Sequence, residues 1–441
     1  MIELLGSKVA VLGTGVTGEE VTKFLLNRGS FVTVYDENEI SDDKKGIFDS
    51  LGVEYYEKVN FDQLTFTDFD LVVKSPGIPW KTGLKRSVDR GIPVVDEVEL
   101  ASWFISFPMI GVTGTNGKST VVALVSEILK RGGYEVFTGG NYGEPLVKAV
   151  DMPFDVAVVE LSSFQIEGLI DAEFLLSTIL NVTPDHLDRY TGFEEYLQTK
   201  LKLVTLTEPF GEVWINRDDE HLSLVDWKRY DQNVNFFSVD VPSEAYIEKG
   251  KLIFRDEEVF PFPKKKIPPE NILASAALAL TWGVEKEVVE DAIASFRGLP
   301  HRMEEFFESG GTIFVDDSKS TNPASLLKAL SVYPPEDTLL LIGGRSKKEG
   351  YEILREKIQR CKYVVFFGED GEFLYRMLEP PAYSIFPRLA EALEDLEKIV
   401  SEVKPRYVLL SPGCASFDEF ENYRERGKFF KQRIREIYGR V

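Results

Sequence analysis

The chain has 441 residues, about three times the length of a usual single domain, which favours two or three domains that each bury a core. Hydrophobic residues make up 43% and charged residues 28%, an ordinary globular composition that argues against disorder. The formal net charge of -22 repels phosphate backbones and anionic lipids, so we expect neither a nucleic acid nor a membrane as a partner.

The two cysteines, Cys361 and Cys414, are too few for a disulfide framework and lack the spacing of a zinc site. The first residues carry no basic segment and continue directly into a strand pattern, and no run of about 18 apolar residues occurs. We therefore expect a cytoplasmic protein, and we expect it to act as a monomer.

Short β-branched runs alternate with amphipathic helices from end to end, which predicts an α/β fold with parallel sheets throughout. A first, Rossmann-like block is predicted from strands at 8–13, 31–36 and 70–78 with a helix at 19–29. A second block has strands at 107–113, 155–160 and 177–182 and helices at 121–133 and 271–283.

A third block, again Rossmann-like, is predicted from strands at 311–317, 338–344, 363–371 and 407–413 and a closing helix at 421–439. The sequence has no internal repeat at a fixed short period and no low-complexity linker. We predict three domains, at residues 1–96, 97–299 and 300–441, the central one with a P-loop ATPase-like parallel sheet.

The motif GVTGTNGKST at 111–120 lies between an apolar run and a helix. Backbone N–H groups of such a turn, together with the helix N-terminus, form a cradle for phosphates. Lys118 would reach the β- and γ-phosphates, and Ser119 or Thr120 would bind a Mg²⁺ that bridges them. Glycine stands at 111 and not at 112, so the motif predicts a variant P-loop.

Two polar side chains follow strands of the same block. Glu160 ends the run DVAVVE, where a carboxylate would emerge at the sheet edge that binds ligands, either as a metal ligand or as a helix-start carboxylate that binds nothing. His186 also follows a strand, and the chain has only three histidines. Spacing alone leaves a structural role for His186 open.

The motif GTGVTG at 13–18 follows a strand and opens a helix, and Asp36 ends the next strand, where a ribose-binding acid would lie. NAD and UDP offer the same diphosphate and ribose hydroxyls, so a dehydrogenase and a UDP-binding protein remain alternatives, as does a turn without a ligand. In the third block, Arg302, Lys319 and Lys347 lie in strand-end loops that could converge into a positive site for an anion.

Together these residues resemble the Mur ligases, the ATP-dependent amino-acid-adding enzymes of peptidoglycan synthesis, over essentially the whole chain. The resemblance is carried by GTNGKST, ELSSFQ around Glu160, NVTPDHLDRY around His186, GLPHR ending at Arg302, DDSKSTNP at 316–323 and SPGCASFDEF at 411–420. The loops GTGVTG, GGRSKK and SPGCASFDEF resemble most the members that add D-glutamate to UDP-N-acetylmuramoyl-L-alanine. The implied activity is an acid–amino-acid ligase reaction through an acyl phosphate.

The resemblance also implies roles for single residues. ATP would be bound by Gly114, Thr115, Asn116, Gly117, Lys118, Ser119, Thr120, Asn271, Arg302 and Asp317. Two Mg²⁺ ions would be held by Ser119, Glu160, His186 and a carbamylated Lys200, with Lys202 as the rival position, and Lys319 would touch the transferred phosphoryl group. Substrate contacts would come from Thr17, Asp36, Asn141, Ser162, His186, Thr321, Lys347, Ser416 and Tyr423.

Some positions depart from the family pattern: IPPEN precedes the nucleotide asparagine, Arg345 replaces a common acid, and Glu37 and Asn38 stand where an arginine is frequent. The alternatives are a sibling ligase for another amino acid and a folylpolyglutamate synthase, which lacks the UDP-binding first block. A nucleotide-driven switch is a further alternative, but it would explain only the P-loop. Such a protein would hydrolyse ATP without an acceptor amine.

Overall fold

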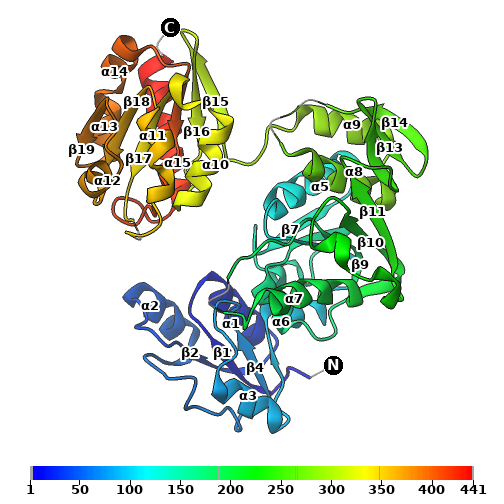
Figure 1. Cartoon of the computed structure of the whole chain (residues 1–441). Coiled ribbons are helices and arrows are strands. Elements are labelled where there is room, and N and C mark those ends of the chain that lie inside the picture. Colours follow the sequence, from blue (N-terminus) through cyan, green and yellow to red (C-terminus); the bar gives the residue numbers. More distant parts are fainter. Residues whose placement is uncertain (1–2, 187–188, 264, 266, 347, 440–441) are drawn as a thin grey trace. The chain divides into compact units, whose positions relative to one another are not determined.

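The computed structural model describes residues 3–186, 189–263, 265, 267–346 and 348–439, and it divides into two compact units, Met1–Phe296 and Arg297–Val441 (Figure 1). Within these ranges the chain forms three sheets, two in the first unit and one in the second. Lys347 lies outside the described residues. No helix in the described ranges is long and apolar enough to cross a membrane.

The first sheet is parallel throughout and has the order β3-β2-β1-β4-β5. Its predicted strands are confirmed, and β3 and β5 are additional. The strands are β1 (Lys8–Leu12), β2 (Phe31–Tyr35), β3 (Glu54–Tyr56), β4 (Leu71–Lys74) and β5 (Val94–Val95), and the helices are α1 (Val16–Asn27), α2 (Asp42–Leu51), α3 (Thr82–Asp89) and α4 (Glu97–Ser102).

The second sheet has the order β14-β13-β12-β11-β10-β9-β6-β8-β7. Its strands are β6 (Met109–Thr113), β7 (Val136–Gly140), β8 (Val156–Glu160), β9 (Phe174–Ile179), β10 (Thr207–Asn216), β11 (Asn233–Ser238), β12 (Ala245–Glu248), β13 (Lys251–Phe254) and β14 (Glu257–Pro261). Its helices are α5 (Lys118–Arg131), α6 (Ser163–Gly168), α7 (Phe193–Thr205), α8 (Pro269–Trp282) and α9 (Lys286–Ser295), with 3-10 turns η1 (Leu146–Ala149), η2 (Leu222–Leu224) and η3 (Trp227–Arg229).

The second unit holds one sheet in the order β15-β16-β20-β17-β18-β19. Its strands are β15 (Glu304–Ser309), β16 (Thr312–Asp316), β17 (Thr338–Gly343), β18 (Tyr363–Phe367), β19 (Tyr383–Phe386) and β20 (Tyr407–Leu410). Its helices are α10 (Pro323–Val332), α11 (Arg355–Gln359), α12 (Gly371–Leu378), α13 (Leu389–Glu394), α14 (Leu396–Val403) and α15 (Tyr423–Tyr438), with turns η4 (Pro335–Asp337) and η5 (Glu352–Leu354).

The prediction of parallel sheets throughout is wrong in two places. Strands β12, β13 and β14 pair antiparallel, and so do β15 and β16. Both regions are tight hairpins, which reverse the chain within two residues and so force antiparallel pairing. The other strand pairs of the three sheets are parallel, so the α/β fold class is confirmed.

Each sheet buries apolar side chains that follow the predicted runs. In α5 the buried residues recur every three to four positions, including Val121, Val125 and Ile128, so one face of the helix packs on the second sheet. In the second unit, α10, α11 and α12 cover one face of the sheet and α13, α14 and α15 cover the other. The carboxyl ends of the central strands therefore stay free to carry loops.

Candidate active site

The predicted P-loop connects β6 to α5 in the first unit. Gly117 caps the helix with a φ of 89°, and a Cβ there would lie 2.4 Å from Oδ1 of Asn271. Only glycine tolerates both this positive φ and this close approach. Asn271 of α8 therefore lies directly against the loop. The N-terminus of α5 directly follows the loop, as a phosphate cradle requires, and Thr120 occupies the third position of this helix.

The P-loop is fixed to the loop that follows β9. The Thr115 backbone N–H donates to the Asn181 carbonyl at 2.9 Å, and the Asn116 N–H donates to Oδ1 of Asn181 at 2.8 Å. The Thr115 hydroxyl lies 3.0 Å from the hydroxyl of Tyr196 on α7. Neither Asn181 nor Tyr196 was predicted from the sequence: Asn181 lies two residues after the end of β9, and Tyr196 lies within α7.

Two lysine amines meet at one carbonyl oxygen of the P-loop. Nζ of Lys118 donates to the Gly114 carbonyl at 2.8 Å and to the Thr115 carbonyl at 3.0 Å, and Nζ of Lys200 donates to the Gly114 carbonyl at 3.0 Å. Lys200 is 1% exposed, and burial together with the positive charge of Lys118 lowers its pKa well below the ordinary value. A lowered pKa favours the neutral amine, the form that reacts with CO₂.

Lys202, the rival for the carbamylated position, points elsewhere. Its Nζ donates to the carbonyl of Leu169, after α6, and burial lowers its pKa as well. It makes no hydrogen bond with the P-loop among the described residues. The geometry therefore favours Lys200 over Lys202 as the lysine next to the phosphate site.

Glu160 ends β8, directly beside Val112 of β6, and is 2% exposed. Its Oε1 accepts a hydrogen bond from Nδ2 of Asn141 at 2.7 Å, while Oε2 is buried and has no hydrogen-bond partner in the described part of the chain. A buried carboxylate oxygen without a donor is costly unless a cation binds it. Glu160 thus fits a metal ligand, and Ser119, buried at the second position of α5, fits the P-loop magnesium position.

Ser162 and His186 flank this region from two loops. Ser162 caps α6 through a capping box with Gln165, so its hydroxyl already accepts a backbone N–H. The His186 ring lies 4.7 Å from the Phe164 ring and its backbone has a φ of 53°. The side chain of His186 is 47% exposed and makes no hydrogen bond with Glu160 or Lys200 among the described residues.

Asp36 uses both carboxylate oxygens within its own block. Oδ2 accepts from the backbone N–H and the hydroxyl of Thr14, at 2.9 and 2.8 Å, and Oδ1 accepts from the backbone N–H of Asn38. The carboxylate therefore orders the GTGVTG turn. Thr17 lies in the first turn of α1 and lines a small crevice with the buried Lys74, which the sequence analysis did not identify.

In the second unit, Asp317 lies in the loop after β16. It is 5% exposed, and its oxygens accept from the backbone N–H of Met303 at 3.1 Å and from the Ser411 hydroxyl at 2.7 Å. Burial raises the pKa of Asp317 to about 7, opposed by these hydrogen bonds and by the charge of Arg302. The structure thus brings Asp317 and Arg302 together, as predicted for a nucleotide site.

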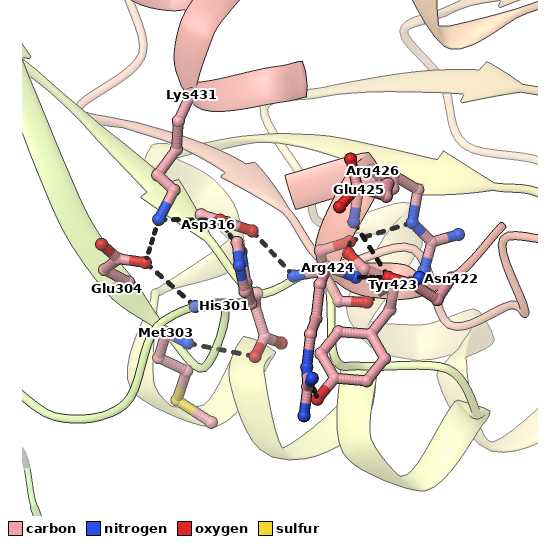
Figure 2. Close-up of polar contacts among 12 residues, drawn as sticks. His301, Met303, Glu304, Asp316, Asn422, Tyr423, Arg424, Glu425, Arg426 and Lys431 are labelled. Carbon is pink, nitrogen blue, oxygen red and sulfur yellow. Dashed lines mark hydrogen bonds and ion pairs between the residues drawn. The ribbon is translucent and has the colours of Figure 1, made fainter. Parts of the chain in front are cut away.

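A second cluster lies beside them, where His301 meets the middle of α15 (Figure 2). Nδ1 of His301 lies 2.6 Å from Oδ2 of Asp316, and Nζ of Lys431 lies 2.7 Å from Glu304 and 3.8 Å from Asp316. His301, Glu304 and Asp316 have metal-ligand chemistry. The Lys431 ammonium already supplies positive charge there, so the cluster reads as a buried ion network.

The remaining predicted contacts lie around the start of α15. Nζ of Lys319 lies 5.5 Å from the centre of the Tyr423 ring, and Tyr423 is the first residue of α15 (Figure 2). Ser416 is buried in the loop after β20, and Thr321 is half-buried just before α10. Lys347 falls outside the described residues, so its predicted role stays a prediction.

Comparison with known proteins identifies the family. The family model of the Mur ligase middle domain matches residues 112–273, and the model of the Mur ligase MurD-like N-terminal domain matches residues 7–96. A UDP-N-acetylmuramoylalanine--D-glutamate ligase of Syntrophus aciditrophicus (strain SB) is 36% identical and covers 98% of this chain and 99% of its own. The chain belongs to the Mur ligase family. A ligase of the same name from Citrifermentans bemidjiense is 37% identical, with 98% of each chain covered.

Solved structures share the fold of this family member. The UDP-N-acetylmuramate-alanine ligase MurC of Thermotoga maritima matches with a TM-score of 0.58 and 20% identity, over 98% of this chain and 100% of the other. MurF ligase of the same organism, solved in complex with ADP, matches with a TM-score of 0.56 and 20% identity, over 98% and 96%. At this identity the likeness concerns the fold.

Proposed function

We propose that the protein is an ATP-dependent ligase that joins D-glutamate to UDP-N-acetylmuramoyl-L-alanine in the cytoplasmic synthesis of peptidoglycan precursors. The observation that carries this proposal is the 36% to 37% identity, over 98% of the chain, to two ligases named for that reaction. ATP use is in line with the family and with the ADP complex of MurF. We also propose that the protein acts as a monomer.

In this proposal each sheet has its own task, with domain boundaries at the predicted residues 96 and 299. The first block binds the UDP-sugar through the GTGVTG turn, ordered by Asp36, and through Thr17. The central block binds ATP on the P-loop. The C-terminal block, through Thr321, Lys347, Ser416 and Tyr423, binds D-glutamate.

A carboxylate is a poor electrophile, so its oxygen must first become a leaving group. The alanyl carboxylate of the sugar substrate attacks the γ-phosphorus of ATP in line, ADP leaves, and an acyl phosphate forms. The Lys118 ammonium stabilises the negative charge on the transferring phosphoryl oxygens. Lys319 is the second cation of this chain that we assign to that group.

Glu160, Ser119 and a carbamate on Lys200 would hold magnesium, with His186 beside them. The metal supplies positive charge that neutralises the phosphoryl oxygens when bound. Support comes from the unpartnered Oε2 of Glu160 and from the lowered pKa of Lys200. The neutral Lys200 amine adds to CO₂ and loses a proton, which leaves a carbamate anion beside the proposed cation site.

In the second step the amine of D-glutamate attacks the acyl carbonyl. The tetrahedral adduct collapses to the amide, inorganic phosphate leaves, and the amine loses a proton. Water would hydrolyse the acyl phosphate, so the groups of the second unit that meet the substrate must also exclude water. Tyr423 and the stem of Lys319 offer apolar surface for this task.

The experiment measures phosphate release from ATP and Mg²⁺ with UDP-N-acetylmuramoyl-L-alanine, with and without each candidate amino acid, together with the product mass. Release that depends on D-glutamate, with a product heavier by one glutamyl group, supports the proposal. Dependence on another amino acid would assign the protein to a sibling reaction. Release without any acceptor would contradict the ligase proposal, and Lys118→Ala serves as the inactive control.

A further inference from the structure

Arg426 is a buried arginine whose hydrogen bonds all go to neutral groups. It lies in the first turns of α15, next to Asn422 and Tyr423 (Figure 2), and is 1% exposed. Its Nε donates to the Ser318 hydroxyl at 3.0 Å, and one terminal nitrogen donates to the carbonyls of Ser318 and Cys414 at 2.9 and 3.0 Å. Among the described residues no carboxylate accepts a hydrogen bond from it.

The charges of Asp418, Asp316 and Glu419 favour the charged form of Arg426, but none of these carboxylates forms an ion pair with it among the described residues. A buried cation without a direct ion pair costs stability, so its presence calls for a compensating role. Burial lowers the pKa of Arg426 to about 10, and the guanidinium therefore stays charged at neutral pH. Its other terminal nitrogen is buried without a hydrogen-bond partner in the described part of the chain. Replacement by an apolar side chain would remove these costs, and it would also remove the link between the two carbonyls.

The two carbonyls belong to two different loops at the carboxyl edge of the sheet. Ser318 follows β16 and precedes Lys319, while Cys414 follows β20 and precedes Ser416 by two residues. β16 and β20 are neighbours in the sheet, so Arg426 bridges adjacent loops. A backbone hydrogen bond joins the same two loops, because the Gly413 N–H donates to the Ser320 carbonyl at 2.8 Å. This bond involves no side chain, and it lies on the C-terminal side of Lys319.

A third loop lies against the same guanidinium. A Cβ on Gly344, after β17, would be 3.2 Å from the unpartnered nitrogen of Arg426 and 2.3 Å from the Ala415 carbonyl. The backbones of Arg345 and Ala415 exchange two hydrogen bonds of 3.0 Å. The guanidinium therefore stands at the point where the loops after β16, β17 and β20 meet.

We propose that Arg426 is a positioning residue that holds the 318–320 and 412–416 loops in register and thereby places Ser416 for the amino-acid substrate and Lys319 for the phosphoryl group. This inference rests on the proposed function, which assigns these loops to D-glutamate and the phosphoryl group. Arg426 itself is buried and does not touch the substrate. Tightly bound charge-assisted hydrogen bonds suit this task, because they fix direction as well as distance.

The test compares wild type, Arg426→Ala, Arg426→Lys and Arg433→Ala in the full chain. Arg433 lies on the same helix, is half-buried and pairs with Glu436 three residues on, so it is the matched control. Arg426→Ala is expected to raise the KM for D-glutamate at least about tenfold and to leave the KM for UDP-N-acetylmuramoyl-L-alanine within about twofold. Guanidinium added at millimolar concentration should restore part of the loss, and urea should not.

A purely structural role would instead reduce the active fraction, and therefore kcat, with both KM values unchanged. That result would overturn the inference. Should Arg426→Ala fail to fold, Arg426→Lys keeps the charge and the stem but replaces the planar fork by a single nitrogen. It is expected to raise the same KM by a smaller factor, and a wild-type ratio of the two KM values would overturn the inference.

Hydrogen exchange separates this inference from the proposed function. Peptides covering 318–320 and 412–416 should exchange faster in Arg426→Ala than in wild type or Arg433→Ala, whatever the amino-acid substrate is. If wild type shows no D-glutamate-dependent phosphate release, the proposed function fails while the exchange data still decide whether Arg426 holds the loops. Unchanged exchange in both segments would overturn the inference even with an active ligase.

Discussion

The side-chain amine of Lys200 has a lowered pKa for two reasons that act together. Desolvation and the nearby Lys118 ammonium both lower the pKa, and Nζ donates a hydrogen bond to the P-loop carbonyl of Gly114. The family resemblance pointed to Lys200 with Lys202 as the rival, and the sequence alone could not separate two lysines so close together. Only the packing of α7 against the P-loop separates the two.

Lys200→Ala should lower turnover by at least about 100-fold, because an anion beside the phosphate site is lost. Acetate or formate at millimolar concentration should restore part of the activity by taking the place of the carbamate. Phosphate release under saturating substrates measures both effects.

Lys202→Ala is the matched control for this variant. It removes a lysine from the same helix that bonds to Leu169 and not to the P-loop. It should keep most of the activity and show no response to acetate. The assignment of the carbamate to Lys200 is wrong if acetate rescues the Lys202 variant instead.

The buried carboxyl group of Asp96 should make the stability of the fold depend on pH. Its Oδ1 accepts the Glu99 N–H at 3.0 Å and so caps α4, while its Oδ2 is buried without a partner in the described part of the chain. Burial raises the pKa of Asp96 to about 7, although the Lys74 ammonium opposes this shift. The unfolded value is about 3.9.

Between about pH 4 and pH 7 the folded protein therefore holds a proton that the unfolded chain has lost, and wild-type stability falls as the pH rises. Asp96→Asn keeps an N-cap residue and does not titrate. Its stability advantage over wild type should grow through this window by up to about 4 kcal/mol and stay constant above pH 7. Urea unfolding of both proteins at several pH values measures it, and an advantage independent of pH would contradict the raised pKa.

Among the elements, the parallel strands were predicted and the hairpins were missed. Buried β-branched runs such as those of β6 and β17 stand out in the sequence, and each is followed by a loop and a helix. The β15–β16 hairpin carried a usable signal, since Gly310 and Gly311 both have positive φ, as a two-residue hairpin turn requires. The β13–β14 turn uses Arg255 and Asp256 with positive φ, a pair that no turn rule favours.

The residues of the candidate site likewise fall into those that the sequence predicts and those that it does not. The P-loop and Glu160 follow from their position at strand ends, which local sequence defines. Asn181, Tyr196 and Arg426 act through contacts with residues far away in the sequence. Nothing in their local pattern distinguishes such residues from any other loop or helix residue, so only the fold reveals them.

Helix α15 offers a test of close packing. A Cβ on Gly427 would lie 2.2 Å from Nδ1 of His301 and 2.8 Å from Oδ2 of Asp316. Gly427→Ala must therefore displace the helix or the buried His301–Asp316 pair, and we expect it to cost about 1–3 kcal/mol of stability. Thermal unfolding should show a lower midpoint.

Gly46→Ala provides the control, because it is the same change inside α2, where a new Cβ meets no atom within 4 Å. It should be neutral or stabilising by up to about 1 kcal/mol, since alanine favours helix more than glycine. Equal midpoints for the two variants would show that α15 does not pack as closely as described.

At the scale of the whole molecule, an acidic protein of net charge -22 is proposed to bind three anionic substrates. The cations assigned to them are divided between the units: Lys118 belongs to the first, and Arg302 and Lys319 belong to the second. Neither unit has the complete set. The proposed reaction therefore depends on residues of both units.

Phosphoryl transfer should consequently need cations from both units. Lys118→Ala and Lys319→Ala should each lower D-glutamate-dependent phosphate release by at least about 100-fold at saturating substrates, because each removes positive charge assigned to the transferring phosphoryl group. Arg433→Ala, in the second unit, should keep most of the activity. Wild-type phosphate release by Lys319→Ala would contradict the assignment of that lysine to the phosphoryl group.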